Sequence, residues 1–351
     1  MPEVSAYKEF LLKEIQAEKI NSSLMEVCGT HTMAIARSGL RGLLPSNLNL
    51  LSGPGCPVCV TAQGDIDMMI ELARRPGLTL ATFGDMMRVP GSDSSLQDER
   101  SRGADVRVVY SPLDALTLAR ENPDREVVFL GIGFETTAPT VAVVLEQAAQ
   151  EGLDNFSVLS LHKTVPPALE VILSDPDIRV DGLICPGHVS AVIGLEPYEK
   201  LVKKYHKPCV ITGFDTQDIL EGIYMLLMQL REGLPSAEIQ YRRVVKTQGN
   251  IVAQETMARV FRPIDARWRG LGVIPDSGLQ IAPEYATWDA GWKFDLPRIE
   301  DKPVKGCACG EILKGRISPY ECPLFGKGCT PLKPIGPCMV SQEGACAAFY
   351  R

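Results

Sequence analysis

Cysteine is the residue type whose number and placement stand out in this sequence of 351 residues. Eleven cysteines occur, six of them between positions 307 and 346, three within the first sixty residues and two in the middle. Thiolates bind soft metal ions and exchange with disulfides. A chain rich in thiols that are kept reduced is therefore expected to carry metal or redox chemistry.

The C-terminal cysteines are widely spaced. Four of them are separated by six, eight and seven residues: Cys322, Cys329, Cys338 and Cys346. Four thiolates can give one ligand to each iron of a [4Fe–4S] cluster, whereas structural zinc sites usually combine two short Cys-x(2–4)-Cys pairs. The spacing favours a cluster and leaves zinc as the alternative. Cys307 and Cys309 are then left over, as an exchangeable disulfide or as free thiols.

The N-terminal cysteines lie in two glycine-containing loops. Cys28 belongs to Val-Cys-Gly-Thr-His31, and the other two belong to Gly-Pro-Gly-Cys56-Pro-Val-Cys59. Each loop follows an expected strand, and the carboxyl ends of parallel strands form one binding edge. A helix N-terminus favours thiolate, which suits low-valent iron. Three thiolates and His31 can therefore converge on one site.

Other interpretations of these loops remain open. Cys28 alone could be a small buried residue, and a Cys-x-x-Cys pair such as Cys56/Cys59 also fits a thioredoxin-like redox motif. His31 could be a metal ligand, a proton shuttle or a hydrogen-bonding loop residue. The four histidines form no His-Glu-x-x-His motif, which disfavours a zinc hydrolase.

Two further loops place polar side chains after expected strands. Residues 131–139 read Gly-Ile-Gly-Phe-Glu135-Thr-Thr-Ala-Pro, a glycine-rich turn that can cradle an anion but lacks a dinucleotide fingerprint. Glu135 is a candidate for a polar residue facing the crevice. Cys185-Pro-Gly-His188 ends another strand, and His188 is a candidate site residue or a packing residue. Cys185 and Cys209 are flanked by apolar residues and are expected in the core.

Short apolar runs alternate with helical patterns from about residue 24 to residue 232, which predicts an α/β fold with parallel sheets. Strands are expected at 24–27, 48–51, 78–83, 106–110, 127–132, 156–161, 182–185 and 209–212. Helices are expected at 65–74, 112–120, 140–150, 191–205, 216–231 and 248–261. We expect two Rossmann-like domains, 1–122 and 123–245, followed by a small cysteine-rich iron–sulfur domain, 246–351.

The charge balance argues against nucleic acid or an anionic membrane as the main partner. The formal net charge is −7, and no long run of one sign occurs. The short basic patches Arg242-Arg243 and Arg267-Trp268-Arg269 are expected to be solvated. The N-terminus shows no secretory signal pattern and no window of 18 uncharged apolar residues occurs, so we expect a cytoplasmic protein.

Taken together, these motifs resemble the HypD family of hydrogenase maturation factors. The residues that carry the resemblance are the loops around Cys28, Cys56/Cys59, Glu135 and His188 and the tail from Cys307 through Pro337-Cys338-Met-Val-Ser to Glu343-Gly-Ala-Cys346. They span almost the whole chain. The resemblance implies two similar α/β domains and a third domain in which four cysteines bind a [4Fe–4S] cluster: Cys322, Cys329, Cys338 and Cys346.

The resemblance also implies a site and partners. Cys28, with Cys56 and Cys59 nearby, would form the site where Fe(II) acquires two cyanides and one carbon monoxide. Family members work with the small chaperone HypC, whose own cysteine shares the iron, and receive cyanide from HypE. Cluster and thiols would pass the electrons. A cluster-dependent thiol–disulfide oxidoreductase without an assembly role is the alternative.

Overall fold

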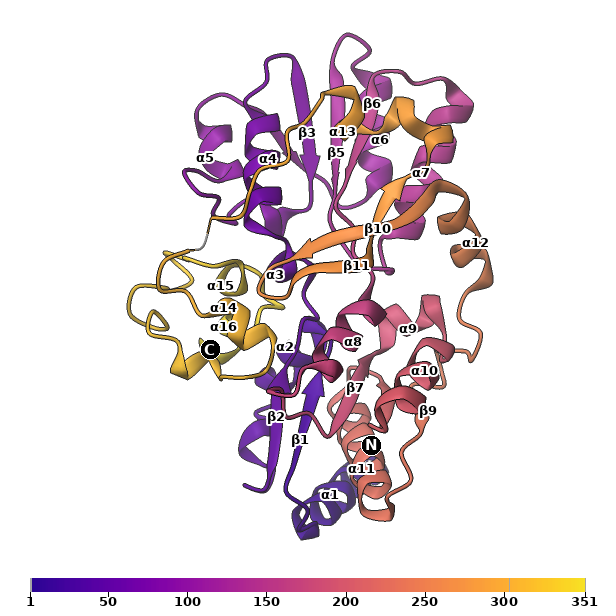
Figure 1. The fold of residues 1–351 in the computed structure, drawn as a ribbon, viewed down its shortest axis with the longest axis vertical. Helices are drawn as coiled ribbons and strands as arrows, with labels where there is room; N and C mark the ends of the chain where they lie inside the picture. The colour runs from indigo at the N-terminus through magenta and orange to yellow at the C-terminus, as the bar shows by residue number, and fades with distance from the viewer. Residues whose placement is uncertain (1, 303, 351) are drawn as a thin grey trace.

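The computed structural model describes residues 2–302 and 304–350 and contains two parallel β-sheets, as the alternation predicts (Figure 1). The first sheet has the order β2-β1-β7-β8-β9. Its strands are β1 (Ser22–Glu26), β2 (Leu48–Ser52), β7 (Gly182–Pro186), β8 (Cys209–Thr212) and β9 (Ala237–Ile239). The second sheet has the order β4-β3-β5-β6. Its strands are β3 (Leu78–Thr82), β4 (Asp105–Val108), β5 (Glu126–Gly131) and β6 (Phe156–Ser160). The α/β class is therefore confirmed.

Helices cover both sheets. They are α1 (Pro2–Ala17), α2 (Gly29–Arg37), α3 (Pro57–Val60), α4 (Gln63–Ala73), α5 (Leu96–Ser101), α6 (Pro112–Glu121), α7 (Ala138–Glu151), α8 (Val165–Ser174), α9 (Gly187–Ile193), α10 (Glu196–Tyr205) and α11 (Thr216–Glu232). Local sequence sets their ends. A Ser111/Asp114 capping box and Pro112 begin α6, and Gly152 at φ 65° ends α7.

The expected helix 191–205 is two helices. Helix α9 ends at Ile193 and α10 begins at Glu196, because Gly194 between them has φ 76° and a backbone that packs against Thr247 and Gly249. A side chain at Gly194 would lie 2.4 Å from the Thr247 carbonyl oxygen.

The two sheets do not divide at residue 122. Strand β1 pairs with β7, which the expected division places in the other domain, and β3 pairs with β5 across the expected boundary. Each sheet is instead built from chain segments on both sides of that residue. Periodicity indicates that a segment is a strand but not which strand lies beside it, so the correct alternation gave an incorrect boundary.

The expected third domain, 246–351, is also divided. Its first part is α12 (Ile251–Val260) and an antiparallel hairpin of β10 (Phe261–Trp268) and β11 (Gly272–Ile281), whose buried ends join the core of the second sheet. Its last part, in yellow in Figure 1, lies beside the first sheet and has short helices only. The remaining elements are η1 (Leu40–Gly42), η2 (Gly84–Met86), η3 (Pro283–Trp288), α13 (Ala290–Lys293), α14 (Cys309–Leu313), η4 (Pro319–Glu321), α15 (Pro337–Val340) and α16 (Ala345–Tyr350).

One apolar core joins these parts. It includes Leu183 of the first sheet, Leu80 of the second and Trp268 of the hairpin, and it continues to buried cysteines such as Cys338 near the C-terminus. Burial of this surface holds the strand ends and the cysteine-rich segment in one arrangement.

No helix in residues 2–302 and 304–350 is both long and apolar enough to cross a membrane.

Candidate functional site at the strand ends

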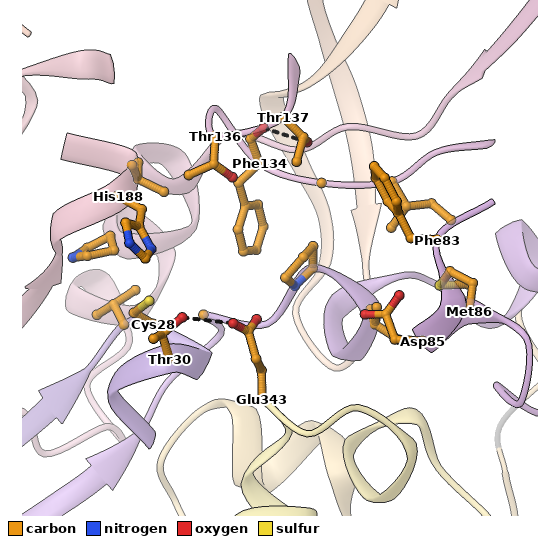
Figure 2. A pocket seen from close by; sticks show the side chains of 18 residues that line it. Cys28, Thr30, Phe83, Asp85, Met86, Phe134, Thr136, Thr137, His188 and Glu343 are labelled. Atoms are coloured by element: carbon orange, nitrogen blue, oxygen red, sulfur yellow. Dashed lines mark hydrogen bonds between the residues drawn. The ribbon is translucent and has the colours of Figure 1, made fainter. Parts of the chain in front are cut away.

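A pocket of about 240 Å³ lies where loops from both sheets meet the C-terminal segment (Figure 2). The loops after β1 and β2 contribute Cys28, Thr30, Gly55 and Pro57, and the second sheet contributes the loop after β5. The side chains labelled in Figure 2 are Cys28, Thr30, Phe83, Asp85, Met86, Phe134, Thr136, Thr137, His188 and Glu343. The pocket is mostly apolar, with one thiol, one imidazole and two carboxylates, which is the usual composition of a small-ligand site.

Cys28 is the only one of the three N-terminal cysteines that lines this pocket. It precedes α2 in an extended conformation, and its loop is held by a hydrogen bond from the Gly29 N–H to the Gly55 carbonyl, 2.9 Å long. A Cβ at Gly55 would lie 2.3 Å from the Cys28 nitrogen, so only glycine permits this approach of the two loops. The pairing of β1 with β2 therefore brings both motifs to one edge, as predicted.

The expected lowering of the thiol pKa at the helix N-terminus is wrong for Cys28. Burial and, second, the Glu343 carboxylate raise the pKa of this thiol to about 11. Hydrogen bonds from the backbone N–H groups of His31 and Thr30 and from the Thr30 hydroxyl act in the opposite direction, but less strongly. Without a bound cation, Cys28 is therefore a neutral thiol at neutral pH.

Glu343 enters the pocket from the C-terminal segment. Its Oε1 accepts a hydrogen bond from Thr30 Oγ1 at 2.8 Å, and its backbone packs against Gly29. Asp85, on the other side of the pocket, has a pKa raised by burial and by the charge of Glu343. Two carboxylates therefore make the pocket electronegative beside the Cys28 thiol, which favours a cationic ligand.

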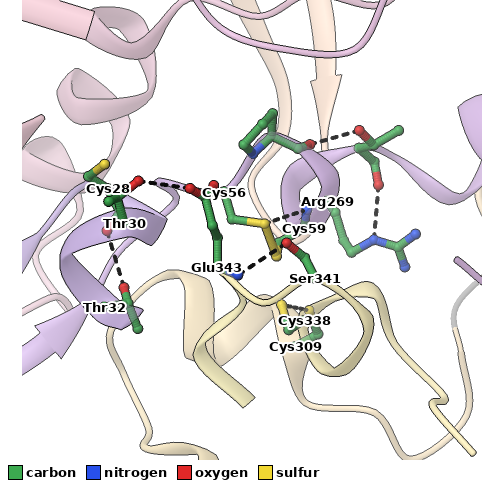
Figure 3. Close-up of a disulfide and its surroundings, with 12 residues drawn as sticks. Cys28, Thr30, Thr32, Cys56, Cys59, Arg269, Cys309, Cys338, Ser341 and Glu343 are labelled. Carbon is green, nitrogen blue, oxygen red and sulfur yellow. Dashed lines mark hydrogen bonds between the residues drawn. A yellow bond between two sulfur atoms is a disulfide. The ribbon is translucent and has the colours of Figure 1, made fainter. Parts of the chain in front are cut away.

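Cys56 and Cys59 form a disulfide behind the pocket wall (Figure 3). The two Cα atoms are 5.2 Å apart, both side chains are buried, and α3 between them begins with Pro57. Helix α3 packs against α15, which carries Cys338. The disulfide therefore lies between the Cys28 pocket and the C-terminal cysteines.

All six C-terminal cysteines line one small apolar cavity: Cys307, Cys309, Cys322, Cys329, Cys338 and Cys346. The Sγ atoms of Cys309 and Cys338 are 2.8 Å apart, so the pair expected to be left over adjoins one of the four expected ligands. Burial, and then the charges of neighbouring cysteines, raise the pKa of Cys346. Soft donors gathered in an apolar cavity match the chemistry of iron–sulfur ligation.

The donor groups are not in metal-binding positions. Across residues 2–302 and 304–350, no three His, Cys, Asp or Glu side chains are arranged around a point that could hold a single ion. A cluster bound by the four expected ligands would need their sulfurs to lie farther apart, since the cavity between the cysteines is small. The donor set fits a [4Fe–4S] cluster in type, number and burial.

Comparisons of this chain with known proteins point the same way as its sequence motifs, its pocket at the strand ends and its cysteine cavity. Residues 6–351 match the family model described as "HypD: Hydrogenase formation hypA family". This chain belongs to the HypD family. The hydrogenase maturation factor HypD of Rhodobacter capsulatus is 50% identical over 333 residues, covering 93% of this chain and 88% of that protein. The Escherichia coli factor of the same name is 48% identical over 329 residues, with the same coverages.

A third relative gives a similar result. A putative hydrogenase expression/formation protein of Methanocaldococcus jannaschii is 45% identical over 336 residues, covering 95% of this chain and 93% of its own. The similarity therefore spans both sheets, the hairpin and the cysteine-rich segment.

In this HypD chain, His31 does not converge with the three cysteine sulfurs. Its Nε2 donates to the carbonyl oxygens of Gly213 (2.9 Å) and Thr212 (3.2 Å), and its ring packs on Phe214. Burial lowers the pKa of His31 to about 4, so the ring is neutral. The observed arrangement is that of a hydrogen-bonding residue, which fixes the Cys28 loop to the end of β8.

His188 and Glu135 have different positions relative to the pocket. His188 lines it, and its ring stacks on Phe214 with centroids 4.0 Å apart. Glu135 is buried outside the pocket lining, and its Oε1 accepts a hydrogen bond from the Val165 N–H at the start of α8. Its neighbours Phe134 and Thr136 line the pocket instead. Cys185 and Cys209 are buried core residues, as expected.

Sequence reasoning missed Asp85, Glu343 and Arg269. Asp85 lies in η2, outside any motif, and Glu343 belongs to the motif that ends at Cys346. Of the two basic patches expected to be solvated, Arg242 and Arg243 are exposed, as expected, whereas Arg267 is half-buried and pairs with Asp65 at 2.6 Å. The one sequence signal for Glu343 is its place between two expected cluster ligands, Cys338 and Cys346.

Proposed function

We propose that this HypD-family chain is a hydrogenase maturation factor that holds iron in the Cys28 pocket while the Fe(CN)2CO unit is assembled. The observation that carries the proposal is the pocket itself. One thiol and two carboxylates, from three chain segments, face a space closed by apolar side chains. Iron is here the substrate, and a single protein thiolate leaves positions on it for three diatomic ligands.

The residues of the pocket have separable roles in this proposal. Cys28 supplies the thiolate, and Asp85 and Glu343 attract the cation, whose positive charge offsets the cost of ionising that thiol beside a carboxylate. His188, exposed at the pocket wall, is placed to exchange protons with a ligand. The apolar side chains Phe134 and Phe83 keep water from the bound iron.

The partners belong to the same proposal. A small chaperone of the HypC type would supply a second thiolate from its own cysteine, and a HypE-type protein would deliver cyanide. Both must reach Cys28, which is half-buried and lies in the loop following β1.

We further propose that Cys322, Cys329, Cys338 and Cys346 hold a [4Fe–4S] cluster. Such a cluster supplies single electrons when it is bound. The Cys56–Cys59 disulfide lies between this cavity and the pocket, so the pair can store two electrons as a dithiol. Cys338→Ala should lower bound iron and acid-labile sulfide, and Cys307→Ala, at the half-exposed position, should not.

Infrared spectroscopy of protein purified anaerobically with its small chaperone tests the scaffold function. We expect bands in the cyanide and carbonyl stretching regions that disappear in Cys28→Ala. Cys209→Ala is a matched control because that thiol is buried in β8 and does not line the pocket. Bands that persist without Cys28 would contradict the proposal.

The buried disulfide favours a second candidate, a cluster-dependent thiol–disulfide oxidoreductase. That activity predicts turnover of a dithiol substrate and no iron beyond the cluster. Iron quantified before and after loss of Cys28 distinguishes the two, since only the scaffold loses iron while keeping its cluster absorption.

A further inference from the structure

Arg269 lies in the turn of the β10–β11 hairpin and is bound to the end of the disulfide helix. Its N–H donates to the Val60 carbonyl at 2.9 Å, and its Nε donates to the Thr61 carbonyl at 3.0 Å. A third bond runs from its guanidinium to Gln63 Oε1, also 3.0 Å. The guanidinium is thus fixed at the junction of α3 and α4, contrary to the solvated patch that the sequence suggests.

The residue after Arg269 contacts the cysteine-rich segment. Gly270, at φ 79°, packs against the backbone of Gly310, and a Cβ at Gly270 would lie 2.3 Å from the Gly310 Cα. Gly310 follows Cys309 at the start of α14. The hairpin turn is therefore wedged between the disulfide helix and the first cysteine helix, and Figure 3 shows Arg269 beside Cys59 with the Cys309–Cys338 pair below.

The charge of Arg269 has no carboxylate partner among the described residues, in contrast to Arg267, which pairs with Asp65. Two contacts place Arg269 next to the cysteine cavity: its neighbour Gly270 packs on Gly310, which follows Cys309, and the helix α3 that it holds packs against α15, which carries Cys338. An unpaired positive charge is therefore fixed beside a cavity with an apolar lining, a medium in which electrostatic effects are strong.

We propose that Arg269 is a positioning residue that raises the reduction potential of the cluster held in the cysteine cavity. The inference rests on the proposed function, because it needs that cluster. Reduction adds one negative charge to a cluster, and a fixed positive charge nearby stabilises the reduced form. Arg269 also holds the end of α3, the helix between Cys56 and Cys59. A shift of this disulfide would therefore move the guanidinium and change the reduction potential of the cluster.

Substitutions can separate charge from shape. Arg269→Gln removes the positive charge. Arg269→Lys keeps the charge but loses the planar array of N–H donors that the guanidinium provides. Gln63→Glu leaves Arg269 in place and puts a carboxylate against its guanidinium, which neutralises it by a second route. Arg262→Gln is the control, because this exposed arginine of the same hairpin loses the same charge beside Glu284.

The measurement is the cluster's midpoint potential, obtained by anaerobic titration with dithionite and mediators and followed by electron paramagnetic resonance. For Arg269→Gln and Gln63→Glu we expect the ratio of reduced to oxidised cluster at a fixed potential to fall about tenfold, a shift of about 59 mV to more negative values. Arg269→Lys and Arg262→Gln should stay near the parent value.

Each outcome decides the inference. Unchanged potentials in both neutralising variants overturn it, and an equal shift in Arg269→Lys assigns the effect to lost geometry rather than charge and also overturns it. If Arg269→Gln does not retain iron, Gln63→Glu decides, since all Arg269 contacts remain. Iron and sulfide are quantified first: a parent protein without a cluster refutes the proposed cluster itself, whereas a cluster with unaltered potentials refutes the role of Arg269 alone.

Discussion

Glu343 of the C-terminal segment accepts a hydrogen bond from Thr30, two residues after Cys28, at 2.8 Å although 313 positions separate the two residues in the chain. The carboxylate stands three residues before Cys346. The cysteine-rich segment therefore contributes directly to the wall of the Cys28 pocket.

Removing the charge of Glu343 should make Cys28 more reactive. Glu343→Gln keeps an acceptor for Thr30 but removes the negative charge that, after burial, raises the thiol pKa. The pKa should fall, and at pH 8 each unit of decrease raises the thiolate fraction about tenfold. The rate of iodoacetamide modification of the Cys28 peptide, followed by mass spectrometry, measures this fraction.

Thr30→Val provides the opposite control for that measurement. Thr30→Val removes the hydroxyl that donates to Glu343 and whose presence lowers the pKa of Cys28, so that pKa should rise and alkylation should slow. Slower alkylation in Glu343→Gln would show that the carboxylate does not act on the thiol as its position implies.

Gly55→Ala should destabilise the protein and displace the Cys28 loop. The new methyl group would lie 2.3 Å from the Cys28 nitrogen, and backbone atoms cannot move aside as a flexible side chain can. We expect a loss of about 1–3 kcal/mol in the free energy of unfolding, typical of overpacking, together with weaker iron retention. Urea denaturation gives the first quantity and iron analysis the second.

Gly42→Ala is the matched control, because a Cβ at Gly42 meets no atom within 4 Å. Its free energy of unfolding should stay within about 0.5 kcal/mol of the parent. Equal stability of the two alanine variants would contradict the close packing of the loops.

Glu135 should make the protein less stable as pH rises. Burial raises the pKa of Glu135 from its ordinary value of 4.5 to about 7. Between these values the folded state keeps a proton that the unfolded state releases, so this contribution is complete below pH 4.5 and is lost as pH rises through 7. The loss is on the order of 3 kcal/mol.

Glu135→Gln removes that dependence, because the amide does not ionise. The stability of the variant relative to the parent should therefore increase between about pH 4.5 and pH 7, as measured by urea midpoints at a series of pH values. A constant difference over this range would mean that the Glu135 carboxylate is already ionised in the folded protein.

The sequence by itself identified the α/β class, most strand positions and the chemistry-bearing loops. Near-continuous apolar runs such as β3, buried at every residue, are dictated locally by the need to cover both faces of a parallel sheet. The placement of Cys28 after β1 and of Cys56 after β2 was enough to bring both loops to one edge. These features depend on neighbours in the chain.

Only the tertiary structure decided which groups meet. It paired β1 with β7, turned His31 toward Gly213, buried Glu135 outside the pocket, and brought Glu343 to Thr30 and Arg269 to the disulfide helix. None of these contacts leaves a periodic signal, because each joins segments far apart in the chain whose approach is set by the shared apolar core. Residue types therefore revealed the chemistry, and packing decided its geometry.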